Sequence, residues 1–152
     1  MRILIIIFLL VSGCGPVPGG KLEGSLVQAP ENWRDILADK AICEVESRPN
    51  KPHSIQLECF LYQEALYVQS HRWVNASWWP TTSWAKIWMS HPEVTVRIGS
   101  SLFDLRAITV TDKAQRLTML KLRGYDPVPE GIVLFRFDSV TEEESGEERT
   151  SK

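Results

Sequence analysis

The chain has 152 residues, a formal net charge of −2, and a composition of 43% hydrophobic and 24% charged residues. This length suits one folded domain with a core of its own. The weak negative charge gives no support to nucleic-acid binding, and we expect no nucleic-acid partner.

The N-terminal segment has the features of a secretory signal. Arg2 precedes nine apolar residues at positions 3–11. A run of that length is far below the roughly 20 residues of a membrane-spanning helix but fits the apolar region of a signal peptide. Small residues then lead to a cysteine in the order Val11-Ser12-Gly13-Cys14. This motif resembles the lipobox of bacterial lipoproteins.

The lipobox resemblance implies that residues 1–13 are a signal peptide and that the Cys14 thiol carries diacylglycerol, with an acyl chain such as palmitate on its amine. Two or more acyl chains hold a protein stably on a bilayer, so Cys14 would anchor the chain to the membrane of the cell envelope. Gly15 stands where an aspartate usually retains lipoproteins in the inner membrane. Its presence favours the periplasmic face of the outer membrane. The alternative is an ordinary secretory signal that is cut elsewhere.

Composition separates a tether and a tail from the folded domain. Residues 15–20 are rich in Gly and Pro, and we assign residues 14–24 to the lipidated cysteine and its tether. Residues 141–152 contain five glutamates and no large apolar residue. Such a segment cannot bury enough surface to order itself. We therefore expect a folded domain over 25–138 and a disordered acidic tail over 139–152.

The first half of the domain reads as a short helix and three strands. Glu31 or Asn32 would start the helix, whose apolar residues have the spacing of one helical face: Trp33, Ile36 and Leu37. The strands are expected at 41–47, 54–62 and 65–70, joined by a proline-containing loop over 48–53 and a tight turn at 63–64. The middle strand alternates, and one of its faces consists of Ile55, Leu57, Cys59 and Leu61.

A second helix is expected after Thr82 or Ser83, either of which can cap it. One face of this helix would consist of Trp84, Ile87 and Trp88. Pro92 disfavours helical geometry at the residue before it, so the helix should stop there. Two strands should follow at 94–98 and 102–110, with a two-residue turn at Gly99-Ser100 between them.

A third helix is expected after Asp112, which can cap it, with Leu117 and Leu120 facing inward and an end near Gly124. With a last strand at 132–137, the chain has six strands and two or three short helices. Mostly sequential antiparallel strands with few helices favour a closed or half-closed barrel. We therefore predict a mainly β fold, a six-stranded antiparallel split β-barrel.

The order of these elements resembles a known superfamily. It runs from a strand through the loop Arg48-Pro49-Asn50-Lys51-Pro52-His53 to two further strands, a helix with Trp84, and the segment Ser90-His91-Pro92-Glu93-Val94-Thr95-Val96-Arg97-Ile98. Over residues 40–137 this order is similar to the split β-barrel flavin-binding proteins. The similarity is to the pyridoxamine-phosphate-oxidase-like superfamily and, within it, to the deazaflavin-dependent nitroreductase-like branch.

The resemblance implies a flavin-like or phosphate-bearing ligand, with FMN or deazaflavin as the cofactor. In such proteins, basic residues of the loop meet cofactor phosphate or acidic tail groups, and the segment after the third strand wraps the cofactor. Carried over, cofactor binding falls to Arg48, Lys51, His53, Ser70, Arg72, Trp84 and Lys86. The resemblance also implies an oxidoreductase and a homodimer formed through the barrel. No catalytic side chain is assigned, because the flavin carries the reaction.

These assignments have simpler structural interpretations. The basic loop can be a solvated hairpin, and Trp84 and Trp88, at helical spacing, can be ordinary core residues. Trp78 and Trp79 are adjacent and cannot both point inward, so at least one is expected at the surface, against a pocket, a partner or lipid headgroups. The alternative function is a non-catalytic envelope lipoprotein that uses a Trp-rich surface to meet a protein or the membrane.

No metal site is expected, because the spacings of Cys43, His53, Cys59 and His71 match no zinc motif. Cys43 and Cys59 are the two cysteines left once Cys14 carries lipid, and the compartment is oxidising.

The hairpin register decides whether these two cysteines meet. In one antiparallel register Cys43 lies opposite Cys59, where a disulfide can form. The same register sets Glu44 opposite Glu58, an unfavourable like-charge pair. A shift of two residues relieves this repulsion and is expected to separate the thiols, leaving both as core residues. The sequence leaves both alternatives open.

Overall fold

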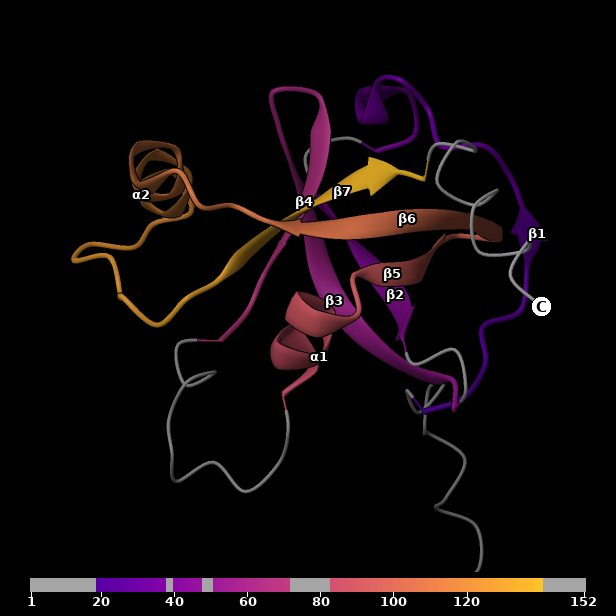
Figure 1. Cartoon of the computed structure of the whole chain (residues 1–152). Helices are drawn as coiled ribbons and strands as arrows, with labels where there is room; N and C mark the ends of the chain where they lie inside the picture. Colours follow the sequence, from indigo (N-terminus) through magenta and orange to yellow (C-terminus); the bar gives the residue numbers. More distant parts are fainter. Residues whose placement is uncertain (1–18, 38–39, 48–50, 72–82, 141–152) are drawn as a thin grey trace, which may run out of the picture.

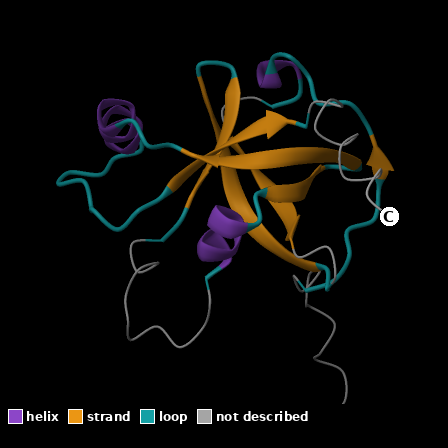
Figure 2. Cartoon of the chain, viewed as in Figure 1, coloured by secondary structure: helices purple, strands orange, loops and turns teal. Residues whose placement is uncertain are grey.

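The structure, a computed structural model, describes residues 19–37, 40–47, 51–71 and 83–140 (Figure 1). In chain order the elements are β1 (Ser25–Leu26), η1 (Trp33–Asp35), β2 (Lys40–Ser47), β3 (His53–Tyr62), β4 (Ala65–Gln69), α1 (Trp84–Ser90), β5 (Glu93–Ile98), β6 (Ser101–Thr109), α2 (Lys113–Leu122) and β7 (Leu134–Ser139). Strands dominate, and the helical elements are short (Figure 2). No helix within the described ranges is long and apolar enough to cross a membrane.

Six strands close into a ring in the order β6-β5-β2-β3-β4-β7, and the pairing of β7 with β6 completes it. Every pair in the ring is antiparallel. β1 lies outside the ring and pairs in parallel with the start of β6. The predicted six-stranded antiparallel barrel in a mainly β fold is therefore confirmed.

The inward faces of all six ring strands form the main core. The alternating residues expected on one face of β3 all belong to it: Ile55, Leu57, Cys59 and Leu61. Tryptophans close both ends of the barrel. At one end Trp33 packs edge-on against Phe103, with 5.1 Å between ring centroids. At the other end Trp88 packs against Phe135, with 5.4 Å between centroids.

α1 forms where the sequence predicts a helix, and it closes one end of the barrel. The Ser83 hydroxyl accepts a hydrogen bond from the Lys86 backbone N–H at 3.4 Å, which caps the helix. Ala85 and Trp88 are fully buried, and Trp84 is half-buried against the same core. The helix ends at Ser90. The burial of Trp88 and the partial burial of Trp84 agree with the interpretation of both as core residues.

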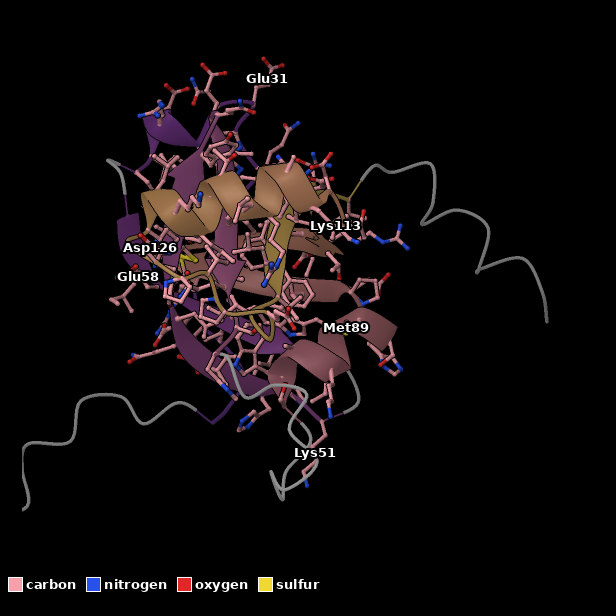
Figure 3. The ribbon with its side chains drawn as sticks, turned by 90° about the vertical axis from the view of Figure 1, so that its left-hand side faces the viewer. Glu31, Lys51, Glu58, Met89, Lys113 and Asp126 are labelled. Carbon is pink, nitrogen blue, oxygen red and sulfur yellow. A yellow bond between two sulfur atoms is a disulfide. The ribbon has the colours of Figure 1, made fainter. Side chains whose placement is uncertain are left out.

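α2 covers the outside of the barrel (Figure 3). It begins after Asp112, whose side chain accepts a hydrogen bond from the Gln115 N–H at 2.7 Å. The helix and the outer faces of the strands share a second core, which consists of Phe60, Tyr67, Met119, Leu120, Ile132 and Leu134. The expectation that Leu117 faces inward is wrong: Leu117 is 43% exposed, and Met119 is 1% exposed. Arg116 and, one turn later, Met119 and Leu120 form the face of α2 that packs on the sheet, and Leu117 lies outside this face.

Two other elements differ in extent from the prediction. The helix expected from residue 31 is a single 3₁₀ turn, in which Trp33 and Leu37 are buried and Ile36 is 43% exposed. The last strand begins at Leu134 rather than at Ile132. Ile132 instead packs in the outer core, where it is 2% exposed.

The register of the β2–β3 hairpin differs by two residues from the one that sets the cysteines opposite each other. Cys43 pairs with Leu57, and Cys59 pairs with Ala41. Glu44 therefore faces Gln56, whose amide donates a hydrogen bond to its carboxylate at 3.2 Å, and the clash of two glutamates does not arise.

The expected separation of the thiols in this shifted register is wrong. Cys43 and Cys59 are diagonal neighbours on the inner face, their Cα atoms lie 5.8 Å apart, and they form a disulfide in the structure. The right-handed twist of paired strands brings one set of diagonal neighbours closer than a flat sheet would. The disulfide therefore links β2 to β3 inside the barrel.

Candidate functional site

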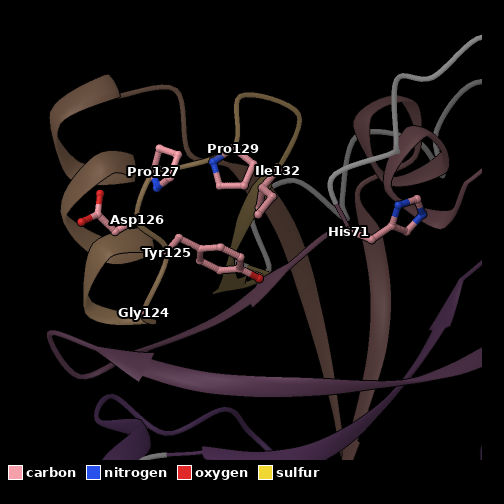
Figure 4. Close-up of a pocket in the computed structure, with 7 residues that line it drawn as sticks. All are labelled: His71, Gly124, Tyr125, Asp126, Pro127, Pro129 and Ile132. Carbon is pink, nitrogen blue, oxygen red and sulfur yellow. The ribbon is translucent and has the colours of Figure 1, made fainter.

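Two segments far apart in the sequence meet beside the end of β4. Ser70 and His71 follow β4, and the loop 123–133 leads from α2 to β7. Between them lies a cavity of about 500 Å³. Its lining residues are His71, Gly124, Tyr125, Asp126, Pro127, Pro129 and Ile132 (Figure 4).

Ser70 joins the two walls of this cavity. Its backbone N–H donates to the Val133 carbonyl at 2.8 Å, and its hydroxyl accepts from the Val133 N–H at 2.8 Å. The same hydroxyl donates to the His71 carbonyl at 3.1 Å. Ser70 is 1% exposed, so these bonds form away from bulk water. Its contacts hold His71 at the cavity rather than leaving its own hydroxyl available to a ligand.

Arg116 holds the opposite wall from α2. Its guanidinium donates to three backbone carbonyls, those of Pro129 at 2.7 Å, Glu130 at 3.0 Å and Ile132 at 3.0 Å. A planar guanidinium with five donors suits such a cluster of carbonyls. The loop is therefore fixed by Arg116 on one side and by Ser70 on the other.

A hydrogen-bonded chain of side chains orients Tyr125. Arg123 pairs with Glu58, and its Nε donates to the side-chain oxygen of Gln69 at 2.5 Å. Arginine has donors only, so it determines which end of the Gln69 amide is the oxygen. The amide nitrogen of Gln69 must then face Tyr125, and it donates to the phenol oxygen at 2.6 Å.

The direction of this chain makes Tyr125 a donor toward the cavity. Its oxygen already accepts from Gln69, and no other partner among the described residues uses its hydrogen. Figure 4 shows the phenol extending from the loop toward the side of the cavity where His71 lies. The cavity thus offers one oriented O–H donor beside the apolar rings of Pro127 and Pro129 and the side chain of Ile132.

Few charged side chains lie near the described part of the cavity. Asp126 brings a carboxylate to the lining, and Arg123 is neutralised by Glu58. In the outer core, burial raises the pKa of Tyr67 above its ordinary value, so this phenol stays neutral. The described lining residues contain no lysine or arginine. The cavity is therefore suited to a planar ring with a hydrogen-bond acceptor, and its described part has no cradle for phosphate.

A second hollow of about 520 Å³ adjoins the first at Gly124. Arg123 lies there with its guanidinium carbon 4.1 Å from the centroid of the Phe60 ring. Arg123 is also engaged by Glu58 and Gln69. Its packing on Phe60 therefore helps to position the hydrogen-bonded side chains that end at Tyr125.

The residues assigned to cofactor binding do not gather at one place. Arg48 and Arg72 lie outside the described residues. Lys51 and His53 are exposed on the β2–β3 hairpin, and Figure 3 shows Lys51 well apart from Asp126 of the cavity. Ser70 adjoins the cavity through His71.

The two assigned residues of α1 have other surroundings. Trp84 packs on Trp88 with 4.4 Å between ring centroids and on Phe135 with 5.9 Å, and Lys86 is exposed. The Trp-rich surface of the alternative function involves Trp78 and Trp79, which lie outside the described residues.

Tyr125, Gln69 and Arg116 were not predicted from the sequence as site residues. The only local signal was the sequence Gly124-Tyr125-Asp126-Pro127, typical of a structured turn after a helix. Among the described residues, no group of three or more His, Cys, Asp or Glu side chains could hold a metal ion.

The strand ring and the side cavity place this chain in the class of small six-stranded antiparallel β-barrels. No family model and no curated protein sequence matches the chain. Among solved structures it is similar to a putative pyridoxamine 5′-phosphate oxidase from Listeria innocua, with 12% identity, a TM-score of 0.49, and coverage of 66% of this chain and 84% of that one. It is also similar to a FAD-binding protein from Mesorhizobium loti, with 17% identity, a TM-score of 0.43, and coverage of 66% and 79%.

Proposed function

We propose that this protein is a cell-envelope lipoprotein whose barrel domain binds a planar, flavin-like ligand in the cavity between His71 and Tyr125. The observation that carries the proposal is the oriented Tyr125 hydroxyl beside apolar walls. A volume of about 500 Å³ lies within the range of small-molecule sites, which combine apolar walls with a few placed polar groups. A flavin ring is flat and carries carbonyl oxygens that accept hydrogen bonds.

The residues of the cavity have separate parts in this binding. Tyr125 donates to a carbonyl of the ring, and the faces of Pro127 and Pro129 pack against it. Arg116 and Ser70 keep the walls in place, which lowers the ordering cost of binding. When bound, a flavin supplies the hydride or electron transfer of an oxidoreductase, and the protein binds and orients it.

A fluorescence titration with riboflavin tests the cavity. The soluble domain from residue 19 onward is expected to quench riboflavin fluorescence on binding. Tyr125→Phe removes only the donor hydroxyl and is expected to weaken binding about 5-fold, the usual size of one neutral hydrogen bond. Tyr62→Phe is the matched control, because Tyr62 lies on the outer face of β3 beside the second hollow. It should bind as the wild type does.

Unchanged fluorescence with the wild-type domain would remove the flavin proposal. FMN tests the phosphate separately. Because the described lining has no cation, FMN and riboflavin should bind with equal affinity, and Lys51→Ala should alter neither. If FMN binds more tightly than riboflavin, and Arg72→Ala abolishes that difference, Arg72 binds the phosphate of FMN.

The lipid anchor is tested by Cys14→Ala in the full chain. The motive is the lipobox-like order Val11-Ser12-Gly13-Cys14. The wild type should sediment with membranes, and the variant should appear in the soluble fraction, because anchoring then depends on acyl chains at one residue. A variant that stays with membranes after a high-salt wash would contradict the lipoprotein assignment.

A further inference from the structure

The point at which the chain leaves the barrel toward Cys14 is held in place. The Gly19 N–H donates to the Ser54 hydroxyl at 3.3 Å, and Ser54 lies near the start of β3. The Leu22 N–H donates to the carboxylate of Glu46, which pairs with Ser54 across the hairpin. Leu22 itself is 7% exposed. The first described residues are therefore attached to the outer face of the β2–β3 hairpin.

The segment then continues across the barrel. Arg97, paired with Glu44, donates to the Glu23 carbonyl at 3.2 Å. Gly24 passes so close to β6 that a Cβ atom there would lie 2.7 Å from the Ser100 carbonyl oxygen. β1 follows and pairs with β6. These contacts fasten residues 19–26, which we call the strap, and the strap determines where the tether begins.

Because residues 19–24 belong to the strap, only residues 14–18 of the predicted tether lie between the barrel and the lipid. Cys14 and Gly19 are five residues apart, so a fully extended chain between them spans at most about 18 Å. β3 has ten residues and, at about 3.3 Å per residue, runs roughly 30 Å from Ser54's end of the barrel to the turn after Tyr62. A barrel standing on its far end would hold Gly19 about 30 Å above the bilayer, beyond the roughly 18 Å that the segment to Cys14 can span, so that orientation is excluded.

We propose that the barrel end formed by the β2–β3 hairpin and α1 faces the lipid surface and contacts its anionic headgroups. This inference rests on the lipid anchor in the proposed function. Lys51 is exposed on the hairpin, and Lys86 and Met89 form the exposed face of α1. A lysine and an exposed thioether on α1, with a second exposed lysine on the hairpin, suit the boundary of headgroups and acyl chains.

The described acidic groups of this end already have partners. Glu46 accepts from the strap, and Glu93 lies 3.8 Å from Arg106. Glu46 keeps its charge, because a backbone N–H does not neutralise a carboxylate, so Lys51, Lys86 and Arg106 together with Glu46 and Glu93 sum to a net charge of about +1. On this view, Lys51 and Lys86 meet the phosphates of headgroups rather than the phosphate of a cofactor.

Site-directed fluorescence quenching tests the orientation in the full lipidated chain. Lys51→Cys and Glu31→Cys each add one labelling site, since Cys14 is acylated and Cys43 and Cys59 form a disulfide. Glu31 follows Gly19 by only twelve residues but lies at the opposite end of the barrel from Lys51 (Figure 3). A label at Glu31 is therefore close to the anchor in sequence but far from it in the fold, so the comparison reports the orientation of the barrel.

The labelled proteins are reconstituted in vesicles of phosphatidylethanolamine and phosphatidylglycerol that contain a headgroup nitroxide lipid. The label at position 51 should be quenched several-fold more strongly than the label at position 31. Equal quenching, or stronger quenching at position 31, in protein that stays on vesicles after a high-salt wash overturns the orientation alone. Protein that the wash removes overturns the lipid anchor and the orientation with it.

A charge reversal tests the lysine contact. Lys86→Glu in the Lys51→Cys protein should reduce quenching at low salt, because one lysine near an anionic surface contributes about 5-fold in affinity. Lys113→Glu, an exposed site on α2, is the matched control and should leave the signal unchanged. If Lys86→Glu has no more effect than Lys113→Glu, the headgroup contact of Lys86 is excluded.

Discussion

Trp88→Ala is expected to lower the free energy of unfolding by about 3–5 kcal/mol, the range for removal of a buried large aromatic side chain. Trp88 has no exposed surface, and its ring packs on Trp84, Phe135 and Phe137 with centroid distances of 4.4, 5.4 and 5.9 Å. The substitution would leave a cavity at the α1 end of the barrel. Urea denaturation followed by far-UV circular dichroism measures the loss.

Trp88→Phe is the control for this result. The indole N–H of Trp88 is buried without a hydrogen-bond partner in the part of the chain that the structure describes. Phenylalanine removes that unpaired donor, which offsets part of the lost packing, so its cost should be well below that of alanine. A cost for Trp88→Ala below about 1 kcal/mol, the size of a typical surface change, would contradict the placement of Trp88 in the core.

Removal of the disulfide by the double change Cys43→Ala and Cys59→Ala is expected to cost about 3 kcal/mol of stability. The bridge closes a loop with a sequence separation of 16, and loops of that length restrict the unfolded chain by about this amount. Dithiothreitol should lower the stability of the wild type by a similar amount and leave the double variant unchanged.

Mass spectrometry of alkylated, unreduced protein provides the independent measurement. Neither Cys43 nor Cys59 should react before reduction, and both should react afterwards in denaturant. Alkylation of both thiols in freshly prepared, unreduced, denatured protein would exclude the bridge and leave the two cysteines as buried packing.

The elements of this fold were accessible from the sequence because their signals are local. Side-chain alternation placed Ile55 and Leu57 on the inner face of β3. The cap at Asp112 could be predicted because its bond spans only three residues. The number and order of the strands predicted a closed or half-closed barrel, and the pairing of β6 with β7 closes it.

The register of the hairpin was decided only in the tertiary structure. A slip of two residues leaves the alternation of side chains unchanged, so the pattern of apolar residues cannot distinguish the two registers. The repulsion between Glu44 and Glu58 was the one local indication, and the shifted register does avoid it. That Cys43 and Cys59 still meet depends on strand twist, which no residue pattern records.

By itself, the sequence determined the strands and the helix caps, because periodicity and capping act over a few residues. It left Trp84 as either a cofactor contact or a core residue. It pointed to Ser70 as a site residue but not to the cavity beside it. Gln69 and Tyr125 are 56 residues apart, and they meet only because β4 pairs with β7 and α2 returns across the outer face. Contacts between segments so distant depend on how the strands close, and for that reason only the tertiary structure decided the site.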